Sequence, residues 1–166
     1  MNTPARPPVR VLMVCLGNIC RSPTAEVVFR QQVEVAGLSH RIEVDSAGTS
    51  DWHKGEPPDS RSVHAASNRL YDLSCVRARQ VEARDFEEFD YVLAMDRQNL
   101  AVLEELCPVG HEEKVELLLD YGNTGWTEVP DPYNAGPEGF ELVLDLVETA
   151  CVELLEMIRA RHDLDD

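Results

Sequence analysis

A cysteine and an arginine, with five residues between them, lie on a short segment whose residue types suit covalent phosphate chemistry. The segment Cys15-Leu16-Gly17-Asn18-Ile19-Cys20-Arg21-Ser22 follows an apolar run at residues 9–14 and precedes a helical pattern. Unpaired backbone N–H groups and the helix dipole at such a junction attract an anion. A thiol there loses its proton easily and becomes a nucleophile, and a guanidinium can grip two oxygens of a phosphate. The segment therefore predicts a phosphatase that works through a cysteinyl-phosphate.

The other residues of this segment suit an anion cradle. Gly17 allows the backbone to approach a ligand closely, and Asn18 tolerates the left-handed geometry that turns N–H groups inward. Ser22 is expected to cap the helix ahead of Pro23, and its hydroxyl to hydrogen-bond the Cys15 sulfur. The alternative is a buried cysteine at the end of a strand beside an ordinary capped helix. The full combination of residues favours the cradle.

Together with residues 23–26, the segment resembles the low-molecular-weight protein-tyrosine phosphatases, whose size also matches. Further matches, spread over roughly residues 9–160, are the segments 45–49, 52–53, 57–61, 77–80 and 131–133. The resemblance implies a cytoplasmic phosphomonoesterase that prefers phosphotyrosine and uses no metal and no cofactor. It also implies tyrosine-phosphorylated proteins as partners, with a cognate tyrosine kinase as a further candidate.

Phosphate transfer also needs a proton for the leaving phenolate, and Asp131 is the candidate general acid and base. It stands between Pro130 and Pro132, whose fixed dihedral angles would hold such a loop in one direction. An Asp-Pro pair by itself more often begins a turn, so it is the resemblance to the family's acid-bearing loop that assigns the catalytic role. Asp120 is the acid most easily confused with it, and we expect Asp120 to be a loop residue.

Apolar and aromatic side chains are expected to form a slot for a phosphotyrosine ring. The expected members are Leu16 and Ile19 beside the thiolate, Trp52 and Tyr133 as walls, and His53 and Asn134 at the rim. A lone Trp or Tyr more often serves packing, but both wall residues fall on positions that the resemblance assigns to the substrate. The slot is expected to be about as deep as a phosphotyrosine side chain is long. The side chain of phosphoserine would then be too short to bring its phosphate to the Cys15 sulfur.

The chain departs from the family's pattern at two places. Many relatives have a histidine, which braces the loop asparagine, at the position of Val76. A hydrogen bond between Asn18 and Ser46 is still expected, in a somewhat less rigid loop. Many relatives also have two adjacent tyrosines where this chain has Tyr133 and Asn134, so any regulation that relies on the second tyrosine is not expected here.

Cys20 has two interpretations of equal weight. It stands five residues from Cys15 across a curled loop, so its thiol could trap a sulfenic acid on Cys15 as a disulfide and make the enzyme redox-sensitive. It could equally be a small buried residue that serves packing.

Composition excludes several other classes of protein. The 166 residues suit one domain with a substantial core, and the net charge of −16 argues against a nucleic-acid partner. Five cysteines at irregular spacing fit a reducing cytosol rather than a disulfide framework, and zinc-ligand spacing is absent. The sequence has no apolar stretch long enough to cross a membrane and no signal-peptide pattern. A monomer is the favoured state.

Alternating strand and helix patterns predict an α/β fold, a doubly wound four-stranded parallel sheet with helices on both faces. Strands are expected at 9–15, 42–46, 91–95 and 115–119; helices are expected after Pro23, from a cap at Asp59 to about 70, from a cap at Asp96 to before 108, and along 140–158. Ligands of such sheets bind at the carboxyl ends of the strands, where the 15–22 segment lies. We expect a flexible tail at 1–8, a single domain at 9–161 and an acidic tail at 162–166.

Three other functions share parts of this pattern. A thioredoxin-coupled arsenate reductase needs two more cysteines close together, whereas Cys75, Cys107 and Cys151 stand far apart. A protein-arginine phosphatase of the same family is expected to have a polar residue, usually threonine, where Ile19 stands. A non-catalytic phosphoprotein-binding module would normally have lost the nucleophile or the acid, and this chain retains both. The tyrosine phosphatase is therefore the favoured interpretation.

Overall fold

Four parallel strands form the sheet on which the candidate site is built. The computed structural model describes residues 6–164. The strands are β1 (Val9–Cys15), β2 (Ile42–Gly48), β3 (Tyr91–Ala94) and β4 (Val115–Leu117). Their order across the sheet is β2-β1-β3-β4, and each neighbouring pair is parallel. This arrangement confirms the predicted fold class.

The central strand β1 is covered on both of its faces. Val11 and Met13 belong to one core cluster, whereas Leu12 and Val14 belong to the other, and all four side chains are fully buried. The alternation follows from the two-residue period of a strand. An apolar residue at each of these positions is what a parallel sheet with two covered faces requires.

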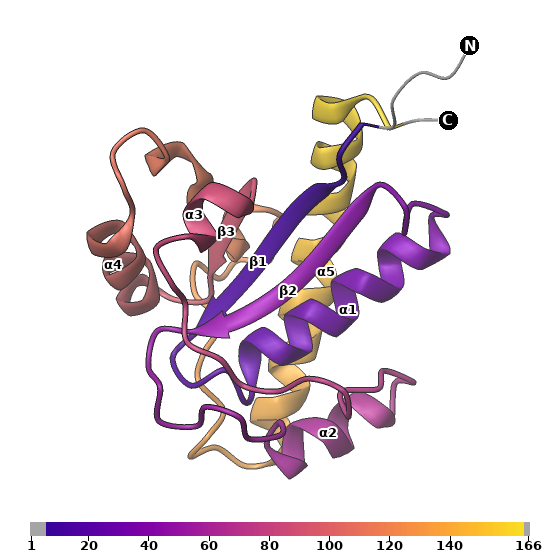
Figure 1. Ribbon diagram of the computed structural model, residues 1–166. Coiled ribbons are helices and arrows are strands. Elements are labelled where there is room, and N and C mark those ends of the chain that lie inside the picture. The colour runs from indigo at the N-terminus through magenta and orange to yellow at the C-terminus, as the bar shows by residue number, and fades with distance from the viewer. Residues whose placement is uncertain (1–5, 165–166) are drawn as a thin grey trace.

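Helices cover the sheet in two layers. Those of the described chain are α1 (Arg21–Val35), α2 (Ser60–Ser67), α3 (Asp85–Glu88), α4 (Arg97–Leu106) and α5 (Pro137–His162). α1 and α5 lie side by side on one face, and α3 and α4 lie towards the other (Figure 1). α2 packs against α5 near the carboxyl ends of the strands. Helix α5 buries a stripe of apolar residues from Phe140 to Ile158, as its helical spacing predicts.

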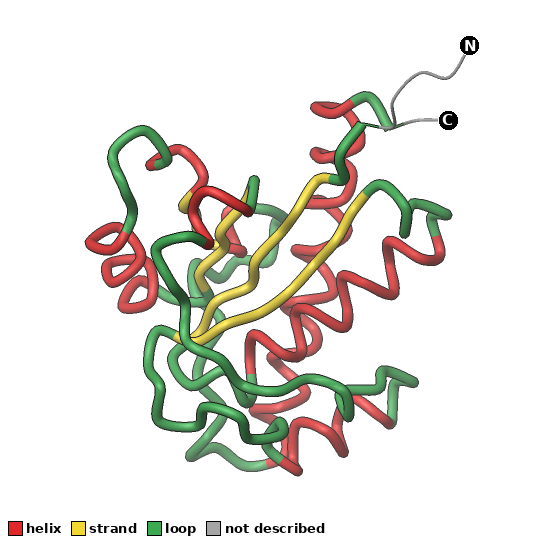
Figure 2. The backbone as a smooth tube through the Cα atoms, in the orientation of Figure 1, coloured by secondary structure: helices red, strands yellow, loops and turns green. Residues whose placement is uncertain are grey.

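The loops that follow β1 and β2 gather at one end of the sheet with the segment that leads into α5 (Figure 2). From β1 the chain passes first to β2 on one side and later to β3 on the other. Such a change of direction leaves a crevice between the loops, and this is where open α/β sheets bind ligands. Cys15, the last residue of β1, lies at this crevice.

Several observed elements end at other residues than predicted. β2 continues through Gly48, while β4 ends at Leu117 because the chain turns into a 3-10 helix, Leu118–Asp120. α2 ends at Ser67, since Leu70 adopts a left-handed φ of 68° that terminates the helix. The short helix α3 is an element that the sequence analysis did not predict.

The predicted end of the domain at residue 161 is too early. α5 includes His162, and Leu164 is only 2% exposed. The Leu164 N–H donates to the Arg159 carbonyl oxygen at 2.9 Å, which folds the chain back onto the helix. Residues 1–5 and 165–166 of the predicted tails lie outside the described residues. Within residues 6–164, no helix combines the length and the apolar character needed to span a membrane.

Candidate active site

The segment after β1 curls around the sulfur of Cys15. Asn18 adopts the left-handed conformation expected of it, with φ of 57°, and its N–H donates to Cys15 Sγ at 3.3 Å. On the outer side of the loop, the Leu16 carbonyl oxygen accepts hydrogen bonds from both the N–H and the hydroxyl of Ser50, each at 3.0 Å. The Leu16 carbonyl oxygen is therefore bonded to Ser50 while the Asn18 N–H faces the sulfur, which is the backbone polarity that an anion-binding loop needs.

Two glycines allow the loop to pack this closely. A Cβ at Gly48, the last residue of β2, would lie 2.8 Å from the Leu16 carbonyl oxygen. A Cβ at Gly17 would lie 3.0 Å from Cδ2 of the His53 ring. Gly17 therefore makes room for a neighbouring side chain of the cleft, a role that the sequence analysis did not predict.

Cys15 is buried at the centre of the loop, with a hydroxyl beside its sulfur. Ser22 Oγ lies 3.0 Å from Cys15 Sγ, which is the contact that the sequence predicts. The prediction that Ser22 caps the helix is wrong, because α1 already begins at Arg21 and Ser22 lies within its first turn. The loop coils so tightly that the helical backbone starts early, which leaves the Ser22 hydroxyl facing the sulfur.

The side chain of Asn18 braces the loop from behind. Its Nδ2 donates to Ser22 Oγ at 2.8 Å and to Ser46 Oγ at 3.0 Å, and its Oδ1 accepts the Arg79 N–H at 3.0 Å. Ser46 in turn donates to the buried carboxylate of Glu26 at 2.5 Å. The expected bond between Asn18 and Ser46 is therefore present, and Glu26 extends the brace in a way that sequence reasoning missed.

Arg21 is the buried cation of the site. Its Nη1 donates to Asp96 Oδ2 at 2.6 Å and to the Val129 carbonyl oxygen at 3.0 Å, and its Nη2 lies 3.7 Å from Asp131 Oδ2. Burial by itself would lower the pKa of Arg21, but Cys15 and the two carboxylates raise it above its ordinary value. The guanidinium is therefore charged and fixed in direction.

Asp96 has a role that the sequence analysis missed. The sequence predicts it only as the cap of α4, and its Oδ1 does accept the Asn99 N–H at 2.8 Å. Its other oxygen, however, holds Arg21. Next to this pair, the Val129 N–H donates to the Met95 carbonyl oxygen at 2.8 Å, which ties the segment before α5 to the end of β3. The only sequence signal was an acid at the carboxyl end of a strand.

Asp131 lies on that segment, at the edge of the site. Its Oδ1 accepts the Tyr133 N–H at 3.0 Å, while its Oδ2 faces Arg21. The residue therefore begins a turn, as an Asp-Pro pair suggests, and also presents its carboxylate to the buried cation. Asp120 lies elsewhere, in the 3-10 helix that follows β4.

A cleft of about 380 Å³ opens at the anion loop. Its lining consists of Cys15, Leu16, Gly17, Ile19, Cys20, Arg21, Trp52, His53, Asp131, Tyr133 and Asn134. Trp52 is 71% exposed and Tyr133 is 47% exposed, so both rings have faces that a ligand can reach.

Of the predicted site residues, Asn18, Ser22 and Ser46 lie behind the loop and hold it. Across residues 6–164, no cluster of three or more His, Cys, Asp or Glu side chains is placed to hold a metal ion.

Residues 10–164 match the sequence model of one family, the low molecular weight phosphotyrosine protein phosphatases. The chain belongs to this family. The low molecular weight protein-tyrosine-phosphatase of Streptomyces coelicolor is 46% identical over 154 residues, which cover 90% of this chain and 93% of the relative. The crystal structure of a protein tyrosine phosphatase from Entamoeba histolytica, with Hepes in its active site, is similar with a TM-score of 0.88 at 39% identity. That match covers 93% of this chain and 98% of the other.

One related structure bears on specificity within the low molecular weight phosphatase fold. It is a Drosophila arginine phosphatase, with a TM-score of 0.83 and 32% identity over 90% of this chain and 97% of the other. Because the same fold carries a protein named for a different phosphorylated residue, the side chains of the cleft must decide which substrate fits.

Cys20 is a buried thiol on the wall of this phosphatase cleft. Burial raises the pKa of Cys20 to about 12, and the nearby carboxylates of Asp59 and Asp131 add to the effect of burial, while a hydrogen bond with Ser62 opposes it. The thiol is therefore protonated near neutral pH and is a weak nucleophile. A redox role for Cys20 stays a prediction.

A pair of substitutions at Asn18 separates the two tasks of this residue in the phosphatase. Asn18→Gly keeps the left-handed backbone and removes the brace, whereas Asn18→Ala also strains the backbone. We expect Asn18→Ala to be about 1 kcal/mol less stable than Asn18→Gly, and both to be less stable than the wild type because Ser46 and the Arg79 N–H lose a partner. Denaturant unfolding of the three proteins measures this, and equal stability of the two variants would contradict the backbone constraint.

Proposed function

We propose that this protein hydrolyses phosphotyrosine in proteins through a phosphocysteine intermediate on Cys15. One observation carries the proposal: the sulfur lies in the cleft, 3.3 Å from the Asn18 nitrogen and 3.0 Å from the Ser22 hydroxyl, in the same lining as buried Arg21. Such an arrangement stabilises a thiolate and offers a cationic fork to a phosphate. The family of the chain and the named activity of its relatives support the same reaction.

In the first step, the Cys15 thiolate attacks the phosphorus atom. A sulfur–phosphorus bond forms while the bond between phosphorus and the tyrosine oxygen breaks, and the Asp131 carboxyl gives its proton to the leaving oxygen. The loop N–H groups and Arg21 bind the phosphoryl oxygens, which carry the negative charge. This step releases tyrosine and leaves Asp131 as a carboxylate.

In the second step, water hydrolyses the intermediate. The Asp131 carboxylate takes a proton from the water molecule. At the same time the water oxygen attacks phosphorus and the sulfur–phosphorus bond breaks. Cys15 departs as a thiolate, to which the Ser22 hydroxyl at 3.0 Å can donate a hydrogen bond. The step releases phosphate and restores both Cys15 and the protonated Asp131.

The cleft favours an aromatic phosphate ester. Trp52 and Tyr133 supply exposed ring faces beside the loop, and the β-branched Ile19 adds an apolar wall. A phosphoarginine substrate would bring guanidinium N–H groups against the Ile19 side chain, where they lack acceptors. We therefore assign phosphotyrosine rather than phosphoarginine as the substrate.

We also propose the cytoplasm as the compartment, because a thiol nucleophile needs reducing surroundings. All five cysteines are unpaired thiols, which suits that setting. Tyrosine-phosphorylated proteins are the proposed partners, with a cognate tyrosine kinase among the candidates. We propose that the active form is a monomer.

Replacement of the nucleophile tests the mechanism directly. Cys15→Ser is expected to fold, to bind phosphate and to show essentially no turnover of an aryl phosphate, because a serine hydroxyl is not ionised at neutral pH. Cys75→Ser, a change at an exposed cysteine outside the cleft, is the matched control and is expected to keep wild-type rates. Substantial turnover by pure Cys15→Ser protein would overturn the covalent mechanism.

The role of Asp131 is tested with leaving groups of different basicity. Asp131→Asn is expected to lose on the order of 10² to 10⁴ in rate for a basic phenolate that needs a proton. The loss is expected to be much smaller for an aryl phosphate whose phenolate departs without one. Asp120→Asn is the matched control and is expected to behave like the wild type. Equal losses for both leaving groups would mean that Asp131 only shapes the loop.

Ile19 is expected to discriminate between phosphotyrosine and phosphoarginine peptides. A polar group that is buried without a partner costs about 1 to 3 kcal/mol of binding free energy. The wild type is therefore expected to prefer the phosphotyrosine peptide over the phosphoarginine peptide by roughly ten-fold to a hundred-fold in kcat/KM. Ile19→Thr is expected to reduce the ratio, because it supplies a hydroxyl and removes a methylene group. Equal hydrolysis of both peptides by the wild type would contradict the assigned substrate and leave the phosphocysteine chemistry standing.

A further inference from the structure

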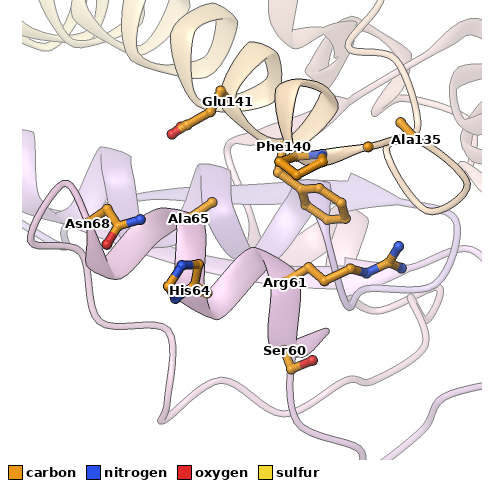
Figure 3. A pocket seen from close by; sticks show the side chains of 10 residues that line it. Ser60, Arg61, His64, Ala65, Asn68, Ala135, Phe140 and Glu141 are labelled. Carbon is orange, nitrogen blue, oxygen red and sulfur yellow. The ribbon is translucent and has the colours of Figure 1, made fainter.

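A second hollow lies between α2 and the start of α5 (Figure 3). Its volume is about 530 Å³, larger than that of the catalytic cleft. Its main lining residues are Arg61, His64 and Ala65 on α2, and Ala135, Pro137 and Phe140 at the start of α5. We call this hollow the α2–α5 pocket. The reaction described above makes no use of it.

The α2–α5 pocket and the catalytic cleft share one stretch of chain. Tyr133 and Asn134 line the cleft, and the next residue, Ala135, lines the pocket. Adjacent Cα atoms are 3.8 Å apart, so the two hollows border the same short segment of the chain. A residue next to a phosphotyrosine in the cleft is therefore within reach of the edge of the pocket.

Arg61 forms the partition between the two hollows. Its guanidinium carbon lies 5.3 Å from the centre of the Tyr133 ring and 4.9 Å from the centre of the Phe140 ring. Asp59 holds the guanidinium with two hydrogen bonds, at 3.0 and 2.9 Å. The Asp59 N–H also donates to the Ile19 carbonyl oxygen at 2.8 Å. The partition is therefore tied directly to the anion loop.

The lining of the pocket suits an apolar side chain. Phe140 and Ala65 are 4% and 8% exposed and present buried hydrocarbon to the hollow. Arg61 is already paired with Asp59, and the carboxylate of Glu141 also borders the pocket. An acidic side chain would find little uncompensated positive charge there, on a chain whose net charge is −16.

We propose that the α2–α5 pocket binds one apolar side chain of the substrate protein, within four residues of the phosphotyrosine and on one side of it. The inference rests on the proposed function, because it assumes that a phosphotyrosine peptide occupies the cleft. It adds a sequence preference that the cleft alone does not supply. The occupant is an aliphatic side chain, and leucine is the probe for it.

Phosphotyrosine peptides with alanine flanks test this inference. Leucine or glutamate replaces one alanine at a time, from four positions before the phosphotyrosine to four after it, and kcat/KM is measured from phosphate release. At one position, on one side, leucine is expected to raise kcat/KM about ten-fold through partial burial, and glutamate is expected to give no gain.

Two variants of α2 assign the effect to the pocket. Ala65→Leu places a larger side chain in the hollow beside Phe140 and is expected to reduce the leucine gain to less than about two-fold, because it covers part of the apolar wall that the peptide side chain would contact. Ser67→Leu makes the same type of change at an exposed position on the same helix, outside the pocket, and is expected to keep the gain. The ratio of leucine to alanine peptide, taken within one preparation, does not depend on the folded fraction.

Three outcomes would overturn the inference alone: equal rates for leucine and alanine at every position, a leucine gain that survives in Ala65→Leu, or a preference for glutamate over leucine. In each case hydrolysis of the alanine-flanked peptide would leave the proposed function intact. Failure of the wild type to hydrolyse any phosphotyrosine peptide or aryl phosphate would instead overturn the proposed function, and this inference with it.

Discussion

The left-handed backbone at Asn18 is the constraint on which the rest of the site depends. A φ of 57° is unfavourable for a residue with a side chain. It is held by three hydrogen bonds of the Asn18 side chain, which donates two and accepts one. Their partners come from α1, from β2 and from the backbone at Arg79. The parallel sheet brings these segments to one end, so the fold stabilises a local conformation that the loop alone would rarely adopt. That conformation turns the Asn18 N–H to the Cys15 sulfur.

Features that depend on neighbouring residues could be predicted from the sequence, and features that depend on strand order could not. The anion loop was visible because nucleophile, arginine and helix start lie within eight residues. The apolar run of β1 indicated a sheet covered on both faces. Asp96, by contrast, signalled only a helix cap, since its bond to Arg21 exists because β3 neighbours β1. The cap at Ser22 was wrong for a local reason, because the helical backbone already starts at Arg21, before the predicted cap.

The site also shows how a strongly acidic chain can be built to bind a dianion. Arg21 is buried among two carboxylates and a carbonyl oxygen, so its charge is oriented rather than exposed. Attraction for phosphate then comes from hydrogen-bond donors at short range, whereas the net charge of −16 repels an anion at longer range. A partner that carries little negative charge beyond its phosphate meets the least repulsion, which agrees with an apolar neighbour in the α2–α5 pocket.

The tie between Arg21 and the Val129 carbonyl oxygen has a consequence for protein synthesis. Translation delivers the anion loop first and the segment that carries Val129 and Asp131 more than a hundred residues later. Until that segment leaves the ribosome, the nascent chain has a thiol and a guanidinium, but neither the carbonyl that orients the guanidinium nor the acid of the proposed reaction. A growing chain therefore lacks the acid of the proposed reaction and the carbonyl that orients Arg21 until almost the whole domain has been made.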